Sequence, residues 1–128
     1  MSGADAFGTV RHGIVLFTER FEACVAFYRD TLGLDVWYEK DALVCFRFAG
    51  GYLMVETSGR AVDGIKSRQD GPAMIRLDVA DVAAAAEILR ERGVETEVET
   101  HDWGTIALFA DPDGNRVQLK NADDPFHA

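Results

Sequence analysis

The 128-residue chain lacks most of the features that mark thiolate-metal, membrane or secreted proteins. It has two cysteines, Cys24 and Cys45, and neither belongs to a CxxC pair, so thiolate metal sites and redox motifs are not indicated. No apolar run reaches the roughly 18 residues of a membrane span. The first ten residues, MSGADAFGTV, lack the charged and then apolar blocks of a secretory signal. We therefore expect a cytoplasmic protein with no membrane partner and two buried, reduced cysteines.

Basic residues are also scarce. The chain has 13 Lys and Arg against 22 Asp and Glu, which gives a net charge of −9. Nucleic acid is not an expected partner, because phosphate binding needs clustered Lys and Arg. An acidic chain tolerates a small polar or cationic ligand without pointing to one. The hydrophobic share of 48% suits one compact domain with a real core over residues 1–128.

The same order of structural signals occurs twice along the chain. In each half, a β-rich segment precedes apolar residues at helical spacing, and three further β-rich segments follow. Gly33 and Gly93 stand where a left-handed residue would close each helix. We predict an α+β fold of two tandem βαβββ modules, at about 9–58 and about 72–121. Each helix would cover one sheet face, so that two curled sheets leave a cavity between the modules.

Short motifs predict the turns and caps. Gly50 and Gly51 indicate a tight hairpin turn, and Asp81 is an expected N-cap of the second helix. DPDG at 111–114, with Pro second and Gly fourth, is typical of a type I turn. The loop 58–71 contains three glycines and either links the modules or folds over the pocket as a lid.

The strand GYLMVE places a carboxylate among apolar side chains. Because alternate residues of a strand point the same way, Glu56 shares a face with Tyr52 and Met54. Glu56 either lines a polar cavity or meets water at a sheet edge. In a cavity without metal it needs a partner, and Arg76 is the natural candidate, with Arg47 second.

Two motifs carry a family resemblance. FYRDTLGL after the first strand and FADPDGNRVQL near the end resemble the vicinal oxygen chelate superfamily. That superfamily includes glyoxalase I, extradiol dioxygenases, fosfomycin-resistance enzymes and bleomycin-resistance proteins. The resemblance extends over about residues 10–120. It implies paired βαβββ modules around a cavity and a homodimer, in some members with modules exchanged between chains.

The resemblance also implies where a metal would bind. Metal-dependent members take a ligand, usually His, from the first strand of each module, and another, usually Glu, from each last strand. In this chain the four positions carry Gly13, Glu56, Met74 and Gln118. Two are oxygen donors and neither expected imidazole is present. A Zn, Ni, Mn or Fe ion normally needs about three or more protein ligands, so the usual metal site is expected to be dismantled.

Two histidines keep a metal alternative open. If a bulge shifts the strand registers by one residue, His12 and His101 replace the missing imidazoles, and the ligand set becomes Glu56, Gln118, His12 and His101. Trp103 follows His101 closely and either caps the cavity mouth or packs in the ordinary way.

The leading interpretation is a metal-independent small-molecule-binding protein that resembles bleomycin-resistance proteins, with no cofactor and no assigned catalytic residue. Glu56 would supply charge, and Arg76 and Gln118 would supply polar contacts. Four residues would supply apolar walls: Tyr52, Met54, Met74 and Trp103. The alternative is a divalent-metal-dependent lyase or dioxygenase of the glyoxalase I type with a non-standard ligand set, in which the metal acts as a Lewis acid. A third interpretation is a noncatalytic module whose dimer contacts matter more than its pocket.

Overall fold

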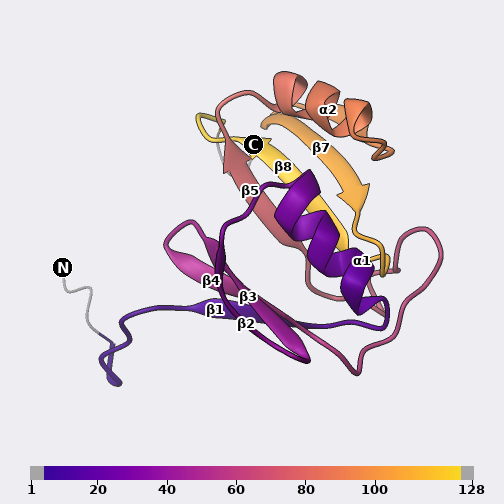
Figure 1. The fold of residues 1–128 in the computed structure, drawn as a ribbon. Coiled ribbons are helices and arrows are strands. Elements are labelled where there is room, and N and C mark those ends of the chain that lie inside the picture. The colour runs from indigo at the N-terminus through magenta and orange to yellow at the C-terminus, as the bar shows by residue number, and fades with distance from the viewer. Residues whose placement is uncertain (1–4, 125–128) are drawn as a thin grey trace. The chain divides into compact units, whose positions relative to one another are not determined.

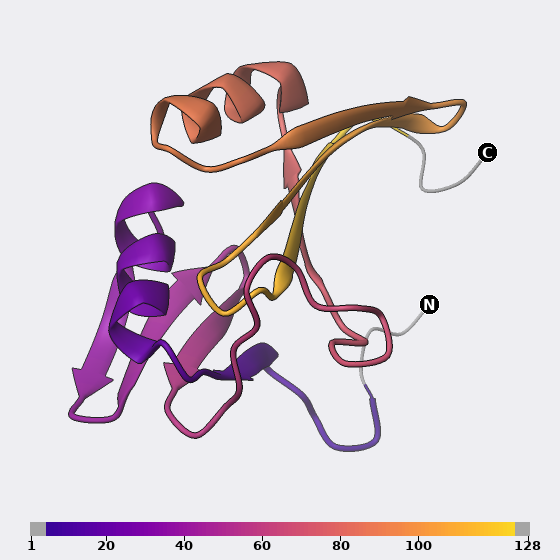
Figure 2. The ribbon, with the colours of Figure 1, turned by 90° about the vertical axis from the view of Figure 1, so that its right-hand side faces the viewer.

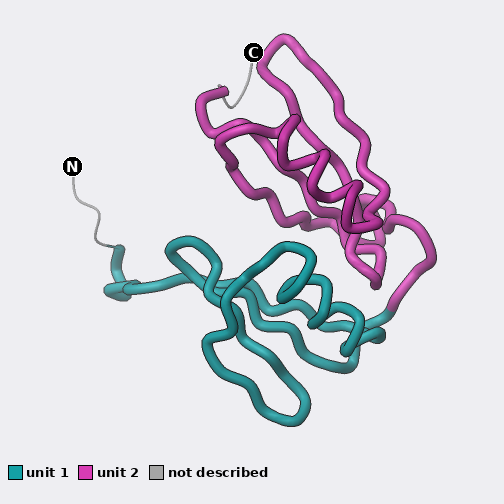
Figure 3. The backbone as a smooth tube through the Cα atoms, turned by 45° about the horizontal axis from the view of Figure 1, so that its top comes forward, with its two compact units in different colours: residues 1–60 teal, residues 61–128 magenta. Residues whose placement is uncertain are grey.

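The chain divides into two compact units, residues 1–60 (unit 1) and residues 61–128 (unit 2) (Figure 3). The structure, a computed structural model, describes residues 5–124. Each unit holds one strand, a helix and three further strands in that order, which confirms the predicted α+β fold of two tandem βαβββ modules. Between residues 5 and 124, no helix is long and apolar enough to cross a membrane.

Unit 1 is built on a four-stranded mixed sheet. Its elements are β1 (Gly13–Phe17), α1 (Phe21–Ala26), the π-helical turn η1 (Phe27–Thr31), β2 (Val36–Lys40), β3 (Leu43–Phe48) and β4 (Gly51–Glu56) (Figure 1). The strand order is β1-β4-β3-β2, with β1 parallel to β4 and the other neighbours antiparallel. The helix lies against one face of this sheet (Figure 2).

The alternation predicted for β4 is confirmed. Leu53 and Val55 are fully buried on the side that α1 covers, whereas Tyr52, Met54 and Glu56 are partly exposed on the other side. The core between helix and sheet therefore takes one face of β4, and the face that carries Glu56 is left uncovered within unit 1.

The first helix ends with a wider turn than its periodicity suggested. After Ala26 the chain continues as η1, in which the Leu32 N–H donates to the Phe27 carbonyl at 2.9 Å. Gly33 follows at φ +74°, the left-handed conformation expected of a helix-ending glycine. The wide turn keeps Phe27 and Tyr28 buried, with their rings 5.2 Å apart in an edge-to-face arrangement.

The hairpin turn between β3 and β4 lies one residue earlier than predicted. Phe48 pairs with Gly51, so the turn residues are Ala49 and Gly50, and Ala49 takes φ +50°. Gly51 is a strand residue, and a Cβ there would lie 2.3 Å from the His12 carbonyl oxygen. A glycine is needed at position 51 because another strand's backbone approaches closely, not because the chain turns there. A Gly-Gly motif looks the same in both cases.

Unit 2 repeats the same topology. Its elements are β5 (Ile75–Val79), α2 (Val82–Glu91), β6 (Glu97–His101), β7 (Gly104–Ala110) and β8 (Arg116–Asn121), and its strand order is β5-β8-β7-β6. The Asp81 carboxylate accepts a hydrogen bond from the Ala84 N–H at 3.1 Å, which confirms the predicted N-cap. Gly93 ends α2 at φ +82°, as predicted.

The segment after residue 60 is fastened to the DPDG turn of unit 2. The Val62 N–H donates to the Asp113 carbonyl at 3.0 Å, and the Lys66 N–H donates to the Gly114 carbonyl at 2.8 Å. The Lys66 ammonium also donates to the Asn115 side-chain oxygen at 2.9 Å. The turn is closed by the Gly114 N–H bond to the Asp111 carbonyl at 2.9 Å, as its sequence predicts. Most of the loop read as linker or lid is therefore part of unit 2.

Candidate functional site

The uncovered sheet face of unit 1, called here the open face, carries the carboxylate that the sequence singled out. The parallel register places Val15 of β1 beside Met54 and Phe17 beside Glu56. Val15 is 43% exposed and Phe17 is 55% exposed, which is high for large apolar side chains. The face therefore offers apolar surface next to a carboxylate.

The ring of Tyr52 lies over Gly13 on the open face. Gly13 pairs with Tyr52 across β1 and β4, and a Cβ built on Gly13 would lie 2.3 Å from the tyrosine ring. Any larger residue at this position requires the ring to move. The aromatic side chain thus fills the space that a first-strand side chain would need at this position.

A β-bulge in β2 adds an aromatic cluster to the same face. The β2–β3 register shifts between Val36 and Tyr38, so Trp37 turns to the same side as Tyr38, and their rings lie 5.7 Å apart. The Trp37 ring also lies 6.3 Å from that of Tyr52.

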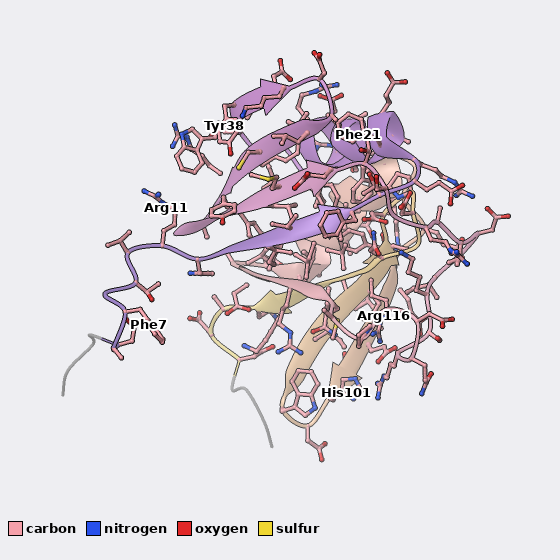
Figure 4. All side chains as sticks on the ribbon, turned by 90° about the horizontal axis from the view of Figure 1, so that it is seen from below. Phe7, Arg11, Phe21, Tyr38, His101 and Arg116 are labelled. Atoms are coloured by element: carbon pink, nitrogen blue, oxygen red, sulfur yellow. The ribbon has the colours of Figure 1, made fainter. Side chains whose placement is uncertain are left out.

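Two guanidinium groups accompany this cluster. The Cζ atom of Arg11 lies 5.1 Å from the centre of the Trp37 ring, and that of Arg47 lies 5.3 Å from it. Arg11 precedes β1 and extends from the segment that leads into that strand (Figure 4). The sequence did not single out Trp37 or Arg11, because the bulge that aims Trp37 depends on pairing with a distant strand.

Tyr38 and Cys45 form a weakly acidic pair on this face. Partial desolvation raises the pKa of the Tyr38 hydroxyl, and the neighbouring Cys45 thiol adds to this effect. Burial raises the pKa of the Cys45 thiol, against a smaller lowering by its hydrogen bond with Tyr38. Both groups are therefore held in their neutral forms near pH 7.

Glu56 and His12 are not placed to share an ion. Among the residues that the structure describes, no hydrogen bond or ion pair is found for the Glu56 carboxylate. Glu56 pairs with Phe17, which stands five residues from His12, or about 16 Å along the strand. Strand alternation also turns His12 and Phe17 to opposite faces. Ligands of one ion must bring their donor atoms within about 4.5 Å of each other.

The corresponding face of unit 2 contains the polar pair predicted for ligand contacts. Arg76 Nε donates to Gln118 Oε1 at 2.5 Å, between neighbouring residues of β5 and β8. This bond lies within unit 2, and the expected pairing of Arg76 with Glu56 of unit 1 stays a prediction. Gln118 is 4% exposed, while Met74, before β5, is 39% exposed.

The Lys120 ammonium, two residues from Gln118, donates to the carbonyls of Asn121 and Asp124.

His101 and Trp103 lie together at the hairpin that joins β6 and β7. Their rings stack at 5.0 Å with planes 4° apart, and His101 Nε2 lies 3.0 Å from a Glu99 carboxylate oxygen. His101 is opposite Gly104, whereas Gln118 is opposite Leu108. The two residues are therefore about 13 Å apart along the strands and about 10 Å across them, too far to bind one ion together.

The residues at the predicted ligand positions do not fit a divalent metal ion. In unit 1 the Tyr52 ring occupies the space at Gly13, and in unit 2 the donor oxygen of Gln118 already accepts from a cationic guanidinium. A positive charge in direct contact with a donor oxygen opposes a second cation there. Among residues 5–124, no group of three or more His, Cys, Asp or Glu side chains is arranged to hold a metal ion.

Comparison with known families agrees with this fold. A model of the Glyoxalase/Bleomycin resistance protein/Dioxygenase superfamily matches residues 11–119. The chain belongs to this superfamily. The match includes both strands with Glu56 and Gln118, as well as the DPDG turn, so the motifs that carried the resemblance lie within the superfamily's common region.

Relatives within the superfamily have diverse descriptions. The uncharacterized protein YraH of Bacillus subtilis is 29% identical over 119 residues, which cover 83% of this chain and 93% of YraH. Biphenyl-2,3-diol 1,2-dioxygenase 2 of Rhodococcus globerulus is 31% identical over 114 residues, which cover 84% of this chain and 60% of the dioxygenase. The chain thus spans less than two thirds of that enzyme.

A solved structure shows the same superfamily fold. TnmS3, an antibiotic binding protein from Streptomyces sp. CB03234, matches with a TM-score of 0.66 and 24% identity, over 88% of this chain and 95% of TnmS3. At this identity the likeness concerns the fold alone. The superfamily therefore defines the scaffold, and the function depends on the side chains of this chain.

Proposed function

We propose that this superfamily member binds a small organic molecule without a metal ion, and that the open face of unit 1 supplies the main contacts. The Tyr52 ring over Gly13 carries the proposal, because it replaces a metal-ligand position with an aromatic wall. Met54, Val15 and Glu56 extend the same face. In unit 2 the candidate contacts are Met74, Arg76, Gln118 and Trp103.

Two further observations support binding rather than metal catalysis. The side-chain oxygen of Gln118 accepts a hydrogen bond from Arg76, so this oxygen is not available as a metal ligand. The amide is instead oriented for polar contacts with a ligand. TnmS3, described as an antibiotic binding protein, has the same fold. The proposal predicts sequestration of a ligand of the kind attributed to bleomycin-resistance proteins.

The rival function is a metal-dependent dioxygenase or lyase, and the 31% identity to the Rhodococcus dioxygenase favours it. Elemental analysis of protein purified without chelators separates the two. We expect Zn, Ni, Mn and Fe well below one equivalent per chain. A near-stoichiometric metal that is lost together with activity in Glu56→Ala would contradict the proposal.

Ligand binding itself is tested by a thermal-shift screen of small molecules with and without EDTA. A ligand at 100 times its Kd adds about 2.7 kcal/mol of stability, which raises Tm by several degrees in a chain of this size. We expect hits whose Tm shifts are the same in EDTA. Hits that vanish with EDTA would favour the rival, and a screen without any hit would favour a module that works through its dimer contacts.

We also propose that the chain forms a homodimer, as superfamily members often do. Exposed apolar side chains away from the open face, such as Ile88 and Val98, leave surface for a second copy to cover. Light scattering during size-exclusion chromatography measures the mass directly. A mass of about 28 kDa, twice 14.1 kDa, is expected, and a mass of one chain at micromolar concentration would contradict the dimer.

A further inference from the structure

Two arginines converge on one tryptophan in a chain that is strongly acidic overall. Arg11 comes from the segment before β1 and Arg47 comes from β3, yet both guanidinium groups lie within 5.3 Å of the Trp37 ring centre. The chain as a whole carries nine more acidic than basic side chains (22 against 13). The two guanidinium groups therefore form a local positive charge in a chain whose net charge is −9.

Neither guanidinium is neutralised within the described part of the chain. No carboxylate between residues 5 and 124 forms an ion pair with Arg11 or Arg47, and neither guanidinium has a hydrogen bond there. Other arginines do have partners: Arg29 pairs with Asp30 at 2.9 Å and Arg90 pairs with Glu87 at 3.1 Å. The donors of Arg11 and Arg47 are therefore available to an incoming anion, which a guanidinium can bind through two parallel N–H bonds.

The backbone is shaped to present this cluster. Without the bulge at Val36–Tyr38, strand alternation would turn Trp37 and Tyr38 to opposite faces. With the bulge, the Trp37 ring lies 6.3 Å from the Tyr52 ring on the open face, close to both guanidinium groups. Trp37 remains 36% exposed, so a ligand has access to its ring.

We infer that Arg11, Trp37 and Arg47 form an anion subsite that takes the acidic group of an organic acid, with Trp37 and Tyr52 packing against its apolar part. The inference rests on the proposed function, because it assigns a ligand class to the same open face. The shared chemistry is an oxyanion next to an apolar ring. A carboxylate and a phosphate ester both present it, and the experiment separates them.

The test uses the full chain and three small probes of similar size: benzoate, phenyl phosphate and uncharged benzamide. The chain has two tryptophans, so a nitrogen–proton correlation spectrum shows two indole signals, and Trp103→Phe assigns the signal of Trp37. We expect both anions to shift the Trp37 signal saturably, with Kd on the order of 1 mM for such small probes. Benzamide is expected to shift it at least tenfold more weakly. The tighter anion identifies the acidic group.

Substitutions then ask whether the arginines cause the selectivity. Arg11→Gln and Arg47→Gln should each weaken anion binding about fivefold, and the double variant should lose saturable binding. Arg29→Gln is the matched control, since it removes the same charge from η1, and it should leave the titration unchanged.

The outcomes are distinct from those of the metal and thermal-shift experiments. Failure of both anions to shift Trp37, equal binding of benzamide, or anion binding that survives the double variant would each overturn the inference. Metal-free binding of another ligand class would stand in all three cases. If the double variant instead changed the mass measured by light scattering, the cluster would be a contact between copies of the chain, and the inference would fail.

Discussion

Gly13 has no side chain, and the ring of Tyr52 lies where its Cβ would be. The contact joins two strands and removes the space that a ligand-bearing side chain would occupy. At the scale of single residues, the proposed loss of the metal site is therefore explained by steric exclusion: the Tyr52 ring takes the place of a ligand side chain at position 13. It can be tested without knowing the ligand.

Gly13→Ala is expected to lower the free energy of unfolding by about 1 to 3 kcal/mol, because the added methyl group overlaps the Tyr52 ring. In a Tyr52→Ala background the same change should cost much less, so the double-mutant cycle should show a coupling of about 1 kcal/mol or more. Urea unfolding measures all four proteins. Gly50→Ala, in the turn between β3 and β4, is the control. No atom lies within 4 Å of its Cβ position, so it should change the free energy of unfolding little. Additive effects of the two substitutions would contradict the contact.

The Cys45 thiol predicts a loss of stability at alkaline pH. Burial raises the pKa of this thiol in the folded chain above the ordinary value of 9.0. The unfolded chain therefore releases this proton first as the pH rises, and the stability present below pH 9 falls until the folded thiol also ionises. The urea midpoint should decrease between pH 8 and pH 10, and Cys45→Ala should decrease less steeply. The same slope in both proteins would show that Cys45 is not responsible.

At the scale of elements, the DPDG turn organises unit 2 by holding the segment that leads into it. Gly114 takes φ +89°, and a Cβ there would lie 2.6 Å from the Val62 side chain. The turn needs a glycine for two reasons, its backbone conformation and the close approach of the 61–71 segment.

Gly114→Ala should therefore destabilise the chain more than Gly64→Ala, which has nearly the same φ, +84°, but no atom within 4 Å of its Cβ position. Gly64→Ala should cost about 1 kcal/mol for the left-handed backbone. Gly114→Ala should cost about 1 to 3 kcal/mol more for the overlap with Val62. It should also speed tryptic cleavage at Lys66 and Arg68 as the segment loosens. Equal stability and equal cleavage in the two variants would contradict the docking.

Local motifs predicted the element boundaries well where one residue determines the backbone. Gly33 and Gly93 end the helices and Asp81 caps α2, since each acts on its own neighbours. The prediction of a turn at Gly50 and Gly51 was wrong by one residue. Gly51 is a glycine because the His12 carbonyl, distant in sequence, lies where its Cβ would be. The bulge at Trp37 was also missed, for it depends on the pairing of β2 with β3.

At the scale of the whole molecule, the internal repeat made the architecture predictable. Two copies of the same strand and helix order specify the tandem βαβββ modules, and the superfamily match agrees. Strand alternation also predicted that Glu56 shares a sheet face with Tyr52 and Met54, which the structure confirms. The bond between Arg76 and Gln118 was not predicted, because cross-strand register cannot be read from one strand alone.

The most direct test of metal independence is calorimetric titration of the chelator-treated chain and its Glu56→Gln variant with Zn²⁺, Ni²⁺, Mn²⁺ and anaerobic Fe²⁺. With the Gly13 position covered by Tyr52 and Gln118 bonded to Arg76, the account predicts only weak binding, with Kd on the order of 1 mM or higher and the same in both proteins. One equivalent of any of these ions bound with micromolar or tighter Kd by the wild-type chain, and lost in Glu56→Gln, would contradict it.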